Sequence, residues 1–111
     1  MIKGIHIGEN GYEVATIDGS LESLYQICKC DLIDVAYVTI KGKPFDVICD
    51  DEGLFKPEEE LFCRVFSRKF GARIVGDVFV CSHNEAEFES LTDEEIELIR
   101  SRIGGGILVV D

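Results

Sequence analysis

Short β-forming segments separated by tight turns are the feature of this sequence that most constrains its fold. Residues 5–7 and 12–17 alternate between apolar and polar positions, as half-buried strands do. The pair Asn10-Gly11 between them is typical of the type I′ turn of a hairpin. A second pair of β-branched and aromatic runs follows within residues 32–49, again interrupted by a turn sequence. The pattern predicts a mostly antiparallel sheet of hairpins.

Helix signals occur at three places in the chain. Ser20 precedes apolar residues at helical spacing, which predicts a helix over 21–28. Thr92 and Glu95 have the spacing of a capping box and predict a helix that begins at residue 93. A proline followed by three glutamates predicts a short helix within 57–66. We therefore expect an α+β fold with two or three helices packed on one face of the sheet.

Length and composition point to one domain over residues 1–111. The chain is 46% hydrophobic, which suffices for a core at this length. A glycine run opens the segment 104–111, whose apolar residues we expect to add a strand or to contact a second subunit of a homo-oligomer. No apolar run reaches membrane-spanning length and the N-terminus lacks a signal-peptide layout, so we expect a cytoplasmic location and no membrane contact.

The order of four motifs resembles a known family. The motifs are IDGSLESL at residues 17–24, ICDDEG at 48–53, IVGDVFV at 74–80 and FESLTDEE at 88–95. In this order they resemble small proteins of bacteriophages and bacterial mobile elements, grouped as a domain of unknown function. The resemblance implies an origin in such an element and a host-cytoplasm location. It implies no activity and no catalytic residue.

Cysteine and histidine residues form one candidate metal site. Zinc accepts a tetrahedral set of three sulfurs and one imidazole, which Cys28, Cys30, Cys81 and His83 would supply. However, each pair is separated by one residue, which is less than the usual ligand spacing. An odd total of five cysteines favours free thiols in a reducing compartment. We expect no cofactor, with zinc as the alternative.

The net charge of −11 disfavours direct binding of nucleic acid and anionic membranes. Carboxylates recur at Glu85, Glu87 and Glu89, and would share one face of a strand, with Glu94 and Glu97 close behind. The structural alternative is a solvated face with helix-capping acids. As a functional hypothesis, we expect a non-enzymatic accessory protein. Its acidic, DNA-like surface would bind a host or element-encoded protein of basic character.

A basic segment within 64–73 offers the alternative function. It contains Arg64, Arg68, Lys69 and Arg73, which would suit a phosphate-bearing ligand such as a nucleotide. Surface pairing with nearby glutamates explains the same residues without a ligand. No nucleophile–base pattern or phosphate-binding loop accompanies the segment, so the sequence favours a non-enzyme.

Overall fold

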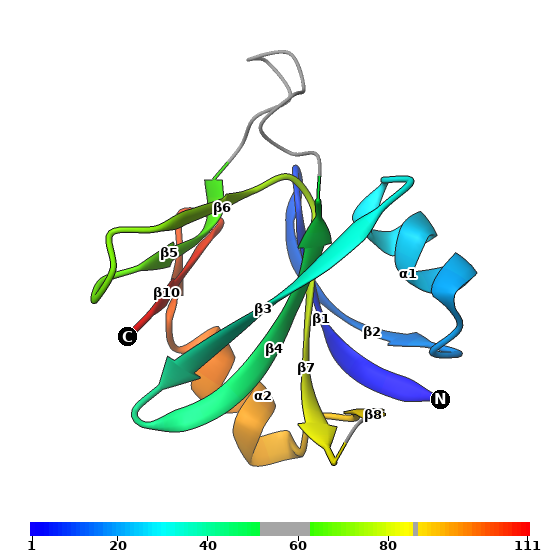
Figure 1. The fold of residues 1–111 in the computed structure, drawn as a ribbon. Helices are drawn as coiled ribbons and strands as arrows, with labels where there is room; N and C mark the ends of the chain where they lie inside the picture. Colours follow the sequence, from blue (N-terminus) through cyan, green and yellow to red (C-terminus); the bar gives the residue numbers. More distant parts are fainter. Residues whose placement is uncertain (52–62, 86) are drawn as a thin grey trace.

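The computed structural model describes residues 1–51, 63–85 and 87–111, and its centre is a large antiparallel sheet (Figure 1). Its strands are β1 (Ile2–Gly8), β2 (Gly11–Ile17), β3 (Ile33–Ile40), β4 (Lys43–Asp50), β7 (Val78–Asn84) and β8 (Glu87–Glu89). The order across the sheet is β2-β1-β7-β4-β3, and β8 pairs with the far end of β7. The expected α+β fold with a mostly antiparallel sheet is confirmed.

A smaller sheet packs beside the first one. It consists of β5 (Cys63–Ser67), β6 (Arg73–Val75), β9 (Ile103–Gly104) and β10 (Ile107–Val110). The order is β6-β5-β10-β9, and β5 and β10 run parallel. At the end of β10, the main-chain N–H of Asp111 donates to the carbonyl of Thr39 at 2.9 Å, which links this sheet to β3.

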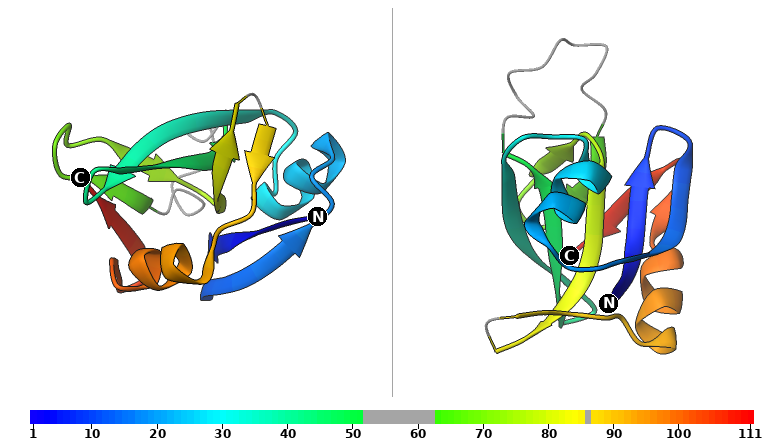
Figure 2. Two further views of the ribbon diagram at one scale, coloured as in Figure 1. Left: turned by 90° about the horizontal axis from the view of Figure 1, so that it is seen from below. Right: turned by 90° about the vertical axis from the view of Figure 1, so that its right-hand side faces the viewer.

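The two helices of the described residues lie on opposite faces of the large sheet (Figure 2). They are α1 (Leu21–Cys28) and α2 (Asp93–Arg100). Val80 of β7 shares a core cluster with Ile96 of α2, whereas its neighbour Phe79 shares the other cluster with Leu24 of α1. The expectation of helices on one face is therefore wrong, because the alternate side chains of β7 are apolar on both faces and each face needs a cover.

Both helices begin as the sequence indicates. The Ser20 hydroxyl accepts from the Ser23 N–H at 3.1 Å. At α2 the capping box is complete, since Thr92 and Glu95 exchange hydrogen bonds of 2.8 and 3.2 Å. Each helix has eight residues, and neither helix in the described part of the chain has the length and apolar composition to cross a bilayer.

The third helix, expected within 57–66, does not form over its described part. Residues 63–66 belong to β5 instead, and residues 57–62 lie outside the described residues. Val65 is buried between β6 and β10, so sheet pairing overrides the helical spacing of its apolar neighbours.

The turn chemistry also differs from expectation. Between β1 and β2 only Gly11 has a positive φ, of 110°, so Asn10-Gly11 does not form a type I′ turn although the hairpin itself is present. Between β3 and β4, Lys41 and Gly42 have φ of 51° and 78°, as the type I′ turn requires.

The C-terminal segment 104–111 is built into the small sheet. β10 has β5 on one edge and β9 on the other, and Leu108 and Val110 are buried. The apolar residues of this segment are therefore buried by strand pairing within one chain, as the first of the two expectations for it states.

Gly4 provides a test of how closely β1 and β7 pack. A Cβ at Gly4 would lie 2.4 Å from the carbonyl oxygen of Val80 and 2.6 Å from the ring of Phe79. We expect Gly4→Ala to lower the free energy of unfolding by about 1–3 kcal/mol, measured by urea denaturation. Gly104→Ala, where the added Cβ meets nothing within 4 Å, is the control and should change it by less than about 0.5 kcal/mol. Equal effects would contradict this packing argument.

Candidate functional site

A hollow of about 530 Å³ lies where β3, β4, β7 and β8 come together. We call it the acidic hollow. Its lining residues are Val35, Tyr37, Asp46, His83, Glu85, Glu87 and Phe88. They combine three carboxylates with three aromatic rings, which is a chemistry suited to positively charged groups.

A buried carboxylate holds one ring of this hollow in place. Asp46 lies in β4 with its side chain 3% exposed, and its Oδ1 is 3.0 Å from Nδ1 of His83. Because a carboxylate only accepts, Nδ1 of His83 donates this bond. In the neutral ring the other nitrogen, Nε2, is then an acceptor for an incoming N–H donor.

Tyr37 stands beside this pair in an exposed position. It is 78% exposed, and its ring meets the His83 ring edge-on with centroids 6.3 Å apart. A large aromatic ring exposed to this degree next to carboxylates offers a stacking surface for a cation.

The predicted glutamates only partly share one strand. Glu87 and Glu89 lie in β8 on either side of Phe88, whereas Glu85 lies in the preceding turn with φ of 56°. Only two of the three carboxylates therefore lie in one strand. All three nevertheless line one hollow at β8, and Glu85 and Glu87 also line the acidic hollow.

The two remaining acidic candidates lie on α2. Glu94 and Glu97 are both exposed, and Glu97 pairs with Arg100 at 3.1 Å. Neither lines the acidic hollow.

The four residues of the basic segment differ in their burial and position. Arg64 is buried in β5, whereas Arg68, Lys69 and Arg73 are exposed at the β5–β6 connection and the start of β6. Lys69 lines a cavity between β3 and the small sheet, but none of the three arginines lines that cavity with it.

The zinc candidates have other contacts. Cys28 and Cys81 belong to the core cluster beneath α1, with Cys30 packed against it, and the Cys28 thiol donates to the Ile48 carbonyl at 3.4 Å. His83 is engaged with Asp46 instead. In the part of the chain that the structure describes, no group of three or more potential ligands is arranged to hold a metal ion.

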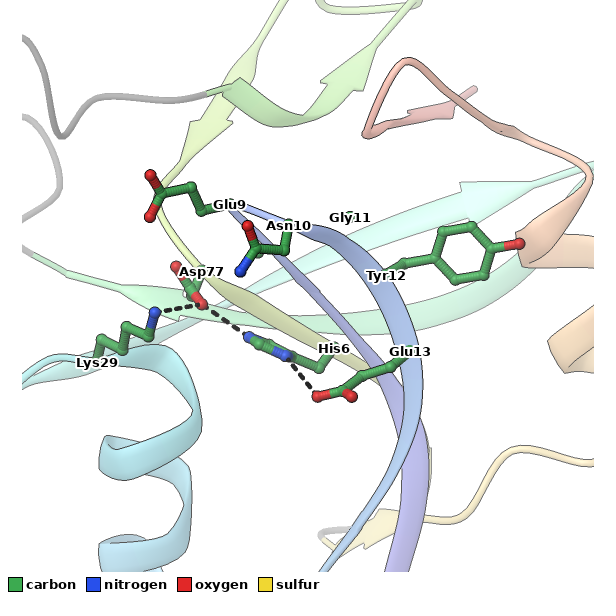
Figure 3. A pocket seen from close by; sticks show the side chains of 9 residues that line it. His6, Glu9, Asn10, Gly11, Tyr12, Glu13, Lys29 and Asp77 are labelled. Carbon is green, nitrogen blue, oxygen red and sulfur yellow. Dashed lines mark hydrogen bonds and ion pairs between the residues drawn. The ribbon is translucent and has the colours of Figure 1, made fainter.

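A second polar site surrounds His6 (Figure 3). Nε2 of His6 is 2.8 Å from Oδ2 of Asp77, and Nδ1 is 3.3 Å from Oε1 of Glu13. The Lys29 ammonium lies 3.7 Å from the same Asp77 oxygen. A depression of about 200 Å³ beside these groups is lined by the β1–β2 turn.

The His6 contacts connect four parts of the fold. They join β1, β2, the residue before β7 and the residue that ends α1. Gly8 makes the approach possible, because a Cβ there would lie 2.7 Å from Oδ2 of Asp77. Since these polar groups bond to one another across four parts of the fold, we assign this network a role in stability.

Sequence reasoning missed Tyr37, Asp46, His6 and Asp77. Asp46 had a signal, because a carboxylate inside an apolar strand predicts a buried partner. The others had none, since these partners lie far away in the chain. His6 and Asp77, for example, are 71 positions apart.

The His6 network predicts a coupling between two substitutions. Asp77→Ala should lower the free energy of unfolding by about 1–3 kcal/mol, because it leaves His6 and Lys29 without this carboxylate. Gly8→Ala should also destabilise the protein, through the clash with Asp77. In a double-mutant cycle followed by urea denaturation, the penalty of Gly8→Ala should shrink when Asp77 is already alanine. Strict additivity would contradict the network.

The buried cysteines predict a thiol-labelling pattern. Burial raises the pKa of Cys49 to about 11 and that of Cys81 to about 12, and it raises the pKa of Cys28 as well. The reactive thiolate is therefore scarce at all three sites near pH 8. We expect a thiol reagent to label Cys30 and Cys63 first, since both are partly exposed. The three buried thiols should react only as the protein unfolds, and rapid labelling of all five would contradict this.

Comparisons with known proteins place the chain in a family. No curated protein and no solved structure matches it. A family model described as a domain of unknown function, DUF3846, matches residues 2–104. Because this match spans nearly the whole sequence, the chain belongs to the DUF3846 family of domains of unknown function.

Proposed function

We propose that this protein is a non-enzymatic accessory protein that binds a basic partner protein through its acidic surface. The resemblance to bacteriophage and mobile-element proteins supports a host or element-encoded partner met in the cytoplasm. The net charge of −11 supports fast, salt-sensitive capture of a positively charged surface.

The observation that carries this proposal is the acidic hollow. Glu85 and Glu87 line it beside the exposed ring of Tyr37, while the buried Asp46 fixes the ring of His83. A lysine or arginine side chain entering there meets carboxylates for its charge and aromatic rings for its stem or guanidinium plane.

The test is capture of a basic protein followed by measurement with charge-matched variants. Immobilised protein is exposed to a bacterial lysate at ~50 mM salt, and bound proteins are identified, purified and titrated individually. We expect a basic protein whose affinity falls at ~500 mM salt. Glu85→Gln/Glu87→Gln should weaken its binding by roughly tenfold.

The control keeps the same change in net charge at another place. Glu9→Gln/Glu22→Gln removes two exposed carboxylates that do not line the acidic hollow, and should leave the affinity within about twofold. An equal loss of affinity in both double variants would mean that binding depends on net charge and not on the acidic hollow. Absence of any basic partner at low ionic strength would contradict the proposal.

A further inference from the structure

The outer edge of β3 presents main-chain groups that the large sheet does not use. In the described residues β3 pairs with β4, and the hairpin closes with Ile40 opposite Lys43. The Thr39 carbonyl accepts from Asp111, so Thr39 directs its main-chain groups away from β4. Because this direction alternates along an antiparallel strand, Tyr37 also directs its N–H and C=O outward.

Among residues 35–39 of the described chain, Tyr37 is the outward-facing position at which neither main-chain group is hydrogen-bonded. On one side, the Val35 N–H donates to the Asp34 carboxylate at 2.8 Å. On the other side, the Thr39 carbonyl is bonded to Asp111. Tyr37 therefore offers both its N–H and its C=O at the edge. Its neighbours on this edge, Val35 and Thr39, each have one main-chain group already hydrogen-bonded.

A hollow lies on each face of the sheet beside Tyr37. The acidic hollow includes Val35 and Tyr37. A second hollow of about 390 Å³ runs between β3 and the small sheet, and we call it the apolar groove. Its apolar lining includes Ala36, Val38, Val65, Phe70, Ile74 and Val110.

The alternation of β3 separates these two hollows. Ile33 and Val35 pack with the core cluster beneath α1, whereas Ala36 and Val38 pack with the cluster on the other face. Tyr37 lines both hollows and is 78% exposed. Phe70 lines the apolar groove and is also 78% exposed. A strand laid along this edge would therefore direct successive side chains alternately to the two hollows.

We propose that the outer edge of β3 is the docking site for an extended segment of the basic partner, in which basic and apolar side chains alternate. The segment pairs with the main-chain N–H and C=O of Tyr37. Its basic side chains lie over Tyr37 toward Glu85 and Glu87, and its apolar side chains enter the apolar groove. This inference rests on the proposed function and specifies the form in which the partner binds.

Charge favours this occupant over a second copy of the chain. Two copies, each with a net charge of −11, repel one another, and β3 itself carries Asp34 at its edge. A basic segment instead gains attraction from the carboxylates that line the acidic hollow. The apolar groove adds a requirement that a purely basic segment does not meet, namely an apolar side chain at every second position.

The experiment uses two synthetic peptides and the whole protein. One octapeptide alternates lysine and valine, and the other contains the same residues in block order; both are blocked at their ends. Binding is followed by amide chemical shifts and hydrogen exchange. We expect the alternating peptide to bind roughly tenfold more tightly and to slow exchange of the Tyr37 amide by at least about tenfold.

Two substitutions at one position separate main-chain pairing from side-chain contact. Tyr37→Ala removes the ring, whereas Tyr37→Pro also removes the outward N–H, a change that an edge strand tolerates. We expect the proline variant to bind the alternating peptide at least about fivefold more weakly than the alanine variant. If the proline variant does not fold, slowed exchange of the Tyr37 amide in the unsubstituted protein decides the same point.

The outcomes separate this inference from the proposed function. Equal binding of the two peptides, or an unchanged Tyr37 amide, would overturn docking at the β3 edge. Capture of a basic protein that Glu85→Gln/Glu87→Gln weakens would then still support the acidic surface. A dimer detected by light scattering, with Tyr37 protected in the absence of peptide, would assign the edge to a second copy and would overturn the inference as well.

Discussion

The alternation of side chains along β7 is the constraint on which the two halves of the interior depend. Val78 and Val80 enter the cluster under α2 and the small sheet, whereas Phe79 and Cys81 enter the cluster under α1, and all four are fully buried. A shift of one residue in the pairing would exchange these sets and place each in the wrong core. Gly4 supports the register, because only a residue without Cβ accommodates the Phe79 ring.

The short length of α1 leaves part of its sheet face uncovered. A helix of eight residues is about 12 Å long, whereas a strand of eight residues such as β4 spans about 27 Å. The uncovered part carries polar and aromatic side chains, with Asp46 satisfied by His83. The acidic hollow therefore follows from the same packing that forms the core. It lies near the end of β7 on the sheet face that α1 packs against, whereas Lys29 at the end of α1 contacts Asp77 just before β7 begins.

Some features could be predicted because neighbouring residues determine them. The capping box of Thr92 and Glu95 requires only a few adjacent residues, and the structure contains it as expected. The hairpin of β3 and β4 follows from two apolar runs around a turn at Lys41-Gly42. The helix expected within 57–66 does not form over its described part. There, β5 pairs with β10, which lies more than forty residues later in the chain, and this pairing determines its conformation.

The candidate site depends on contacts that no local pattern encodes. The sequence indicated Glu85 and Glu87 as a surface feature but placed neither beside Tyr37, because the order β7-β4-β3 that brings them together is a property of the whole sheet. By itself, the sequence determined the hairpins, the helix starts and the strongly acidic charge, all of which arise from short-range dihedral preferences and composition. The tertiary structure alone decided strand order, the faces that the helices cover and the convergence at the β3 edge, because burial on both faces of β7 selects among arrangements that local preferences leave equivalent.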